Sequence, residues 1–145
     1  AILPNMLWGG AAFYNSDILP VAQAVKEKGD QIALCVAACR KYGVQCHVWK
    51  VNYNMGWATD KSFVNKMKSQ GRTQVNFDGS SNERWLCPSH LENQKLEIDS
   101  MLEVARKYDV DGLHFDYIRY PGNEGCFCEG CRQRFEKTVG RKLTN

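Results

Sequence analysis

The chain has 145 residues, 43% of them hydrophobic and 24% charged, and carries a net charge of +3 at pH 7. This length suffices for one ordinary domain with a real core, and the composition excludes a disordered chain. The mild, scattered positive charge forms no basic stripe of the kind that binds nucleic acid, and no apolar stretch approaches the roughly 20 residues that span a bilayer. The opening AILPNMLWGG has no charged leader region, so we expect residue 1 to lie inside a longer chain.

The first part of the chain alternates strand and helix patterns. The apolar stretch 2–8 predicts a strand, and a short helical pattern covers 16–30. A second helix is expected over 30–42, with Asp30 as its N-cap and Gly43 as a left-handed C-terminal cap.

Residues 44–49 alternate in polarity, which predicts a strand with His47 and Trp49 on one face. Cys35 and Cys39 recur at helical spacing in the preceding helix. We interpret them as small core residues, because free cysteine is among the most frequently buried residue types.

The second part repeats the pattern less clearly. A short helix near 61–70 and an extended segment at 73–77 are expected first. Ser89 and Glu92 match a capping box at the start of a longer helix. The apolar face of this helix is predicted to contain Ile98, Met101, Leu102, Ala105 and Tyr108.

A strand at 112–116 follows, with His114 and Asp116 on one side, and a last helix is expected at about 131–139. Alternating strands and helices predict parallel pairing with helices over the sheet. The strands have polar residues at their ends, as in a (β/α)8 barrel, but a whole barrel needs about 250 residues. We therefore predict an α/β fold that is a partial TIM barrel of about three βα units, forming one domain over 1–145.

The strand end at Asp116 is the candidate catalytic edge. A carboxylate at the rim of a barrel can act as nucleophile, general acid or base. Two structural interpretations remain open: Asp116 could cap the following turn through its own backbone, or pair with Arg119. His47 and His114 could likewise be ordinary hydrogen-bonded residues.

Four segments carry a resemblance to a known family: PNMLWGGAAFY, YGVQCHVWKVNYN, WLCPSHLEN and especially DVDGLHFDYIRYP. Together they resemble glycoside-hydrolase-like TIM barrels associated with polysaccharide processing, over nearly the whole chain. The resemblance implies that Asp116 is the catalytic carboxylate and that carbohydrate is the partner. The sugar site it implies is lined by His47, Trp49, Asn52, His114, Tyr117 and Arg119.

A glycosidase of the usual kind needs a second carboxylate, about 5 Å or about 6.5–9.5 Å from the first. We expect it on a later barrel strand beyond Asn145, with Asp78 and Glu124 as weak substitutes within the chain. The alternative is a non-catalytic, zinc-stabilised module that binds carbohydrate. An incomplete barrel would also expose sheet edges, which predicts possible self-association.

Three of the seven cysteines form the motif C-x-C-x-x-C at Cys126, Cys128 and Cys131. Disulfides between such near neighbours are strained, whereas zinc accepts four sulfur or nitrogen ligands in a tetrahedron. We expect Cys87 as the fourth ligand, with His90 as the alternative, and disulfides from Cys87 to the trio as the competing hypothesis. The arrangement is similar to the structural four-cysteine zinc site of a family of barrel β-galactosidases.

Overall fold

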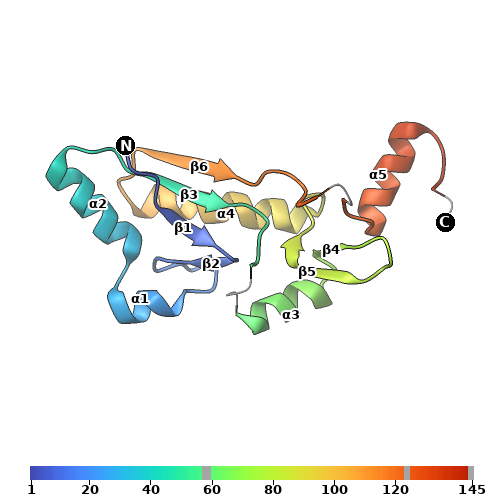
Figure 1. Ribbon diagram of the computed structural model, residues 1–145, viewed down its shortest axis with the longest axis horizontal. Coiled ribbons are helices and arrows are strands. Elements are labelled where there is room, and N and C mark those ends of the chain that lie inside the picture. Colours follow the sequence, from blue (N-terminus) through green and yellow to red (C-terminus); the bar gives the residue numbers. More distant parts are fainter. Residues whose placement is uncertain (57–59, 123–124, 144–145) are drawn as a thin grey trace.

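The computed structural model describes residues 1–56, 60–122 and 125–143 as a mixed α/β unit (Figure 1). The elements in chain order are β1 (Asn5–Trp8), β2 (Ala11–Ala12), α1 (Gln23–Lys28), α2 (Gln31–Tyr42), β3 (His47–Val51), α3 (Lys61–Ser69), β4 (Thr73–Val75), β5 (Ser81–Leu86), α4 (Leu91–Lys107), β6 (Gly112–Asp116) and α5 (Glu129–Val139).

The main sheet has the strand order β2-β1-β3-β6. Strands β1, β3 and β6 run parallel, and β2 pairs antiparallel to β1. Strands β4 and β5 form a separate antiparallel pair. The parallel pairing expected from the sequence is confirmed, while the partial barrel and the single domain stay predictions.

Helices α2 and α4 cover one face of the main sheet. Ile32 and Cys39 of α2 and Met101 and Val104 of α4 share a buried cluster with Val48 of β3. Because side chains alternate across a strand, the neighbours of Val48 in β3, His47 and Trp49, point to the opposite face. The sheet therefore has one face sealed by helices and another that carries His47 and Trp49 of the predicted site.

The capping signals of α2 are confirmed. The Asp30 side chain accepts a hydrogen bond from the backbone N–H of Ala33, and Gly43 adopts the left-handed conformation at the other end. For α4 the capping box is wrong: the N-cap residue is His90, so Ser89 lies one residue too early to cap the helix.

The predicted apolar face of α4 is also partly wrong. Ile98 is 57% exposed and Leu102 is exposed, whereas the buried face includes four polar residues: Asn93, Glu97, Ser100 and Glu103. Each of these four has hydrogen-bond partners, which allows a polar face to be buried. No helix in the described part of the chain has the length and apolar character needed to cross a membrane.

Candidate functional site

The open face of the sheet brings the strand-end residues of β3 and β6 together. In the parallel register Trp49 pairs with His114, and Val51 pairs with Asp116. The rings of Trp49 and His114 meet edge to face, with centroids 6.1 Å apart. The expected common face of His114 and Asp116 follows from this register, since alternate residues of a strand share a face.

His47 lies one step further back along β3, over the start of β6. A Cβ atom placed on Gly112 would lie 2.3 Å from His47 Nδ1. The imidazole thus occupies the space that a side chain at residue 112 would fill. Gly112 therefore leaves room for the histidine ring against β6, the strand that also carries His114.

Asp116 lies at the end of β6, and its Oδ1 atom accepts a hydrogen bond of 2.7 Å from the backbone N–H of Tyr117. This is the turn-capping role considered from the sequence. The backbone of Asn52, just after β3, donates to the Asp116 carbonyl oxygen at 2.9 Å. The strand ladder therefore continues past β3 and ties the ends of both strands together.

Tyr117 has a left-handed backbone with φ of 58°, which is uncommon for a residue with a side chain. Its ring stacks on the buried Trp85 of β5, with centroids 5.8 Å apart and planes inclined by 26°. The Arg119 guanidinium lies 4.7 Å from the Tyr117 ring centroid. In the described residues Arg119 thus contacts this aromatic ring and forms no ion pair with Asp116.

Asn52 lies apart from this open face. Its side chain is buried and donates from Nδ2 to Glu97 Oε2 at 2.8 Å, and Glu97 Oε1 accepts from the backbone N–H of Tyr53 at 3.2 Å. Tyr53 is the second non-glycine residue with positive φ in the described chain. Glu97 of α4 therefore holds the turn after β3 from the helix side.

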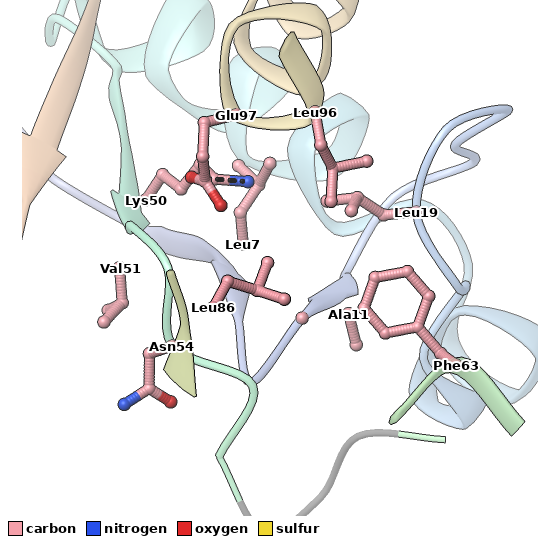
Figure 2. A pocket seen from close by; sticks show the side chains of 11 residues that line it. Leu7, Ala11, Leu19, Lys50, Val51, Asn54, Phe63, Leu86, Leu96 and Glu97 are labelled. Atoms are coloured by element: carbon pink, nitrogen blue, oxygen red, sulfur yellow. Dashed lines mark ion pairs between the residues drawn. The ribbon is translucent and has the colours of Figure 1, made fainter. Parts of the chain in front are cut away.

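Lys50 completes this buried polar group. Its Nζ atom lies 3.4 Å from Glu97 Oε2 and donates to Ser100 Oγ at 2.7 Å. Figure 2 shows Lys50 and Glu97 pointing toward each other, with Leu7 and Leu86 close by. Burial lowers the pKa of Lys50, and the charge of Glu97 opposes that shift. The enclosed space beside the pair is about 10 Å³, far too small for a sugar ring, so the pair has a supporting role.

The cysteine cluster forms from two distant parts of the chain. Cys87 directly follows β5, and the motif C-x-C-x-x-C leads into α5. The sulfur atoms of Cys87, Cys126, Cys128 and Cys131 all lie within 4.8 Å of one another. Cys87 Sγ is 3.6 Å from Cys131 Sγ and 3.7 Å from Cys128 Sγ. Tetrahedral zinc with bonds of about 2.3 Å needs sulfurs about 3.8 Å apart, so the four ligands fit that ion.

Backbone contacts support the cluster. The N–H of Val75 in β4 donates to Cys126 Sγ at 3.4 Å, and the N–H of Phe127 donates to the Val75 carbonyl oxygen at 2.8 Å. Hydrogen bonds from the Cys87 thiol and from backbone N–H groups lower the pKa of Cys126 to about 5, although burial opposes this. All seven cysteines are free, so the disulfide hypothesis is not supported by the structure.

The suggested substitutes for a second carboxylate receive little support. Asp78 lies in the turn between β4 and β5, where its Oδ1 atom accepts hydrogen bonds from the Ser80 N–H and hydroxyl. These bonds lower the pKa of Asp78 and serve the turn. Glu124 lies outside the described residues. His90, the alternative metal ligand, is the N-cap of α4, and the four cysteines converge without it.

Two residues that position this edge were missed from the sequence, Trp85 and Glu97. Trp85 belongs to β5, a strand that we did not predict because SNERWL has a largely polar, charged first half. Glu97 sits among charged neighbours in α4, and its burial follows from its partners in the turn after β3. The spacing of Asn93, Glu97 and Ser100 on one helix face is the signal that could have found it.

Comparison with known proteins gives one finding. A family model described as "Glycosyl hydrolase-like 10" matches residues 1–140. None of the curated proteins matches the chain.

Proposed function

The chain belongs to the glycosyl hydrolase-like 10 family, and from this premise we propose that it acts on a polysaccharide or oligosaccharide through the edge formed by β3 and β6. Its role is glycoside-hydrolase-like. The observation that carries the finer proposal is the register that aligns Trp49 with His114 and leaves Asp116 at the end of the same strand. Aromatic faces suit the apolar faces of sugar rings, and histidine and carboxylate groups suit their hydroxyls.

In this proposal Asp116 is the catalytic carboxylate, and it lies in a partial TIM barrel. His47, Trp49 and His114 line the open face, and Tyr117 and Arg119 form its rim. Asn52, which was expected to contact sugar, lies outside this site because its side chain is buried against Glu97. A second carboxylate is required for hydrolysis, and we propose that it comes from outside the residues described here.

The metal in this proposal is zinc, held by Cys87, Cys126, Cys128 and Cys131. Four thiolates complete a tetrahedral shell and leave no open position, so such an ion is structural. It would fix the segment after Asp116 against the β4–β5 hairpin. Metal analysis should find one zinc per chain and four thiols that become reactive when a chelator removes it. Metal-free protein with an unchanged fold would contradict the zinc assignment.

The rival function is a zinc-stabilised module that binds carbohydrate without cleaving it. The hydrogen bond from the Tyr117 N–H to Asp116 favours this binding module, because capping the turn gives the carboxylate a structural role without catalysis. Self-association through the edge strand β6 is a separate prediction that light scattering would check.

The substitution Asp116→Asn separates these functions. Wild-type protein and the variant should both bind a polysaccharide in a glycan screen, while the variant loses hydrolysis by about 1,000-fold or more, measured as released reducing ends. Asp99→Asn on α4, whose carboxylate pairs with Lys95 on the surface, is the matched control and should change neither property. Binding without cleavage by the wild type would favour the module, equal cleavage by both would remove Asp116 from the mechanism, and no binding would refute the carbohydrate proposal.

A further inference from the structure

A second group of cysteines lies on the helix-covered side of the sheet. Cys35 and Cys39 are one turn apart on α2, and Cys46 immediately precedes β3. Their three sulfur atoms all lie within 4.8 Å of one another, and the sulfurs of Cys35 and Cys46 are 3.8 Å apart. Cys39 and Cys46 are buried, as expected for core residues, while Cys35 is half-buried at the edge of the core.

The chain fixes these sulfurs from both sides. The spacing i, i+4 places Cys35 and Cys39 on one face of α2. On the other side, the Cys46 N–H donates to Asp111 Oδ2 at 2.9 Å, and the Asp111 N–H donates to the Cys46 carbonyl oxygen at 2.9 Å. Arg40 of α2 pairs with Asp111 at 3.3 Å, which joins the helix to the same loop. These contacts fix the backbone at Cys46 and join it to α2, which supports the arrangement of the three sulfurs.

We propose that Cys35, Cys39 and Cys46 form a second metal site, a three-thiolate site for a soft monovalent cation, with Cu(I) as the representative ion. A three-coordinate ion with bonds of about 2.3 Å needs sulfurs about 4 Å apart, which matches the separations here. Soft thiolate ligands select Cu(I) and zinc. Zinc favours a fourth ligand, and among the described residues the group contains three.

The surroundings keep the cysteines as neutral thiols until a cation replaces their protons, because burial raises the pKa values of Cys35 and Cys46. Cys39 lies in the last turn of α2, where the helix dipole places partial negative charge and so disfavours a free thiolate. The Asp111 carboxylate lies next to Cys46. Each metal–sulfur bond replaces an S–H bond, and the released protons go to solvent, so no electrons are transferred. The half-buried Cys35 provides the route by which the ion enters.

The test uses the whole chain loaded with zinc and titrated with Cu(I) under anaerobic conditions, in the presence of a Cu(I) chelator that removes weakly bound ion. Native mass spectrometry should find one copper in addition to one zinc. X-ray absorption should find three sulfur neighbours at about 2.3 Å from the copper. The variant Cys35→Ala should lose the retained copper and keep the zinc, and Cys128→Ala should lose the zinc and keep the copper.

Three results would overturn the proposal. The first is wild-type protein that retains no copper against the chelator. The second is Cys35→Ala protein that retains as much copper as the wild type. The third is native protein whose mass is lower by two hydrogens, with a disulfide mapped to Cys46, because the trio would then be an oxidised pair. If Cys35→Ala fails to fold, the sulfur count around copper in the wild type decides the question by itself.

Discussion

Replacing Glu97 by glutamine would test how the turn after β3 is held. Glu97 is buried, pairs with Lys50 and accepts hydrogen bonds from the Asn52 side chain and the Tyr53 N–H. Glutamine keeps the size of this side chain but removes its charge and replaces one acceptor oxygen by an amide nitrogen, which cannot accept a hydrogen bond from these donors. Lys50, which is 4% exposed, then has no counter-ion in contact among the residues that the structure describes.

The expected loss of stability depends on whether the buried Lys50 keeps its charge or loses its proton. Breaking a buried ion pair from one side costs about 3–5 kcal/mol of unfolding free energy. An unpaired buried lysine can instead lose its proton, and from an ordinary pKa of about 10.4 this costs up to about 4.6 kcal/mol at pH 7. The two estimates agree, so we expect Glu97→Gln to lower the free energy of unfolding by about 3–5 kcal/mol.

The pH dependence identifies the cause. In the variant, the folded pKa of Lys50 falls further below its unfolded value, so the unfolded state binds more protons and stability rises with pH. The deficit relative to wild type should shrink by about 1.4 kcal/mol per pH unit above pH 7. Urea unfolding followed by tryptophan fluorescence between pH 7 and 9 measures it.

A surface pair provides the control for this experiment. Glu83 pairs with Lys68, and both side chains are about half exposed. Glu83→Gln should cost less than about 1 kcal/mol at every pH. A Glu97→Gln deficit as small as that of Glu83→Gln, or one that does not change with pH, would refute the reasoning.

Three further predictions concern the same edge and its support. Trp85→Ala should lose about 3–4 kcal/mol of stability and weaken sugar binding because the stacked tyrosine loses its partner, whereas Trp85→Phe should lose less than half as much in the same urea assay. Gly112→Ala should cost about 1–3 kcal/mol and shift the NMR signals of the His47 ring, since the new Cβ needs its space, while Gly122→Ala, with open space around it, should do neither. Hydrogen bonds outweigh burial and lower the pKa of Glu103, so its stabilising effect is present above its unfolded pKa and is lost as pH falls through the lowered folded value. Glu103→Gln should therefore cost about 2 kcal/mol at pH 7 and much less below pH 4, which thermal unfolding at both pH values would measure.

Local signals predicted the elements whose ends are set by their own residues. Helix α2 begins after Asp30 and ends before Gly43 as its caps indicate, and the bounds of β6 are those expected from its pattern. The four-cysteine cluster was also predictable, because the spacing C-x-C-x-x-C demands a shared partner and Cys87 is the cysteine beside the neighbouring strand.

Features that depend on distant partners were not predictable in this way. Glu97 is buried because the turn after β3 presents an amide, a backbone N–H and an ammonium group to it, and none of these is near α4 in sequence. The strand β5 forms because β4 pairs with it, and this pairing outweighs the largely polar sequence of β5, which by itself does not predict a strand. The prediction that Asn52 contacts sugar was wrong for a similar reason, because a distant residue, Glu97, sets the direction of its side chain.

The candidate edge depends on two tyrosines in the left-handed conformation, Tyr53 after β3 and Tyr117 after β6. Such residues each cost of order 1–3 kcal/mol and persist where the surrounding structure holds them. Here the Glu97 carboxylate holds Tyr53 by accepting a hydrogen bond from the Tyr53 backbone N–H, and Trp85 holds Tyr117 by stacking on its ring. Because Trp85 lies two residues before Cys87, the four-cysteine cluster and the aromatic stack secure the same end of β5. Removing the proposed zinc should therefore loosen Tyr117 before it disturbs the β3–β6 ladder, so hydrogen exchange of the Tyr117 amide should rise on chelation while that of His114 stays protected.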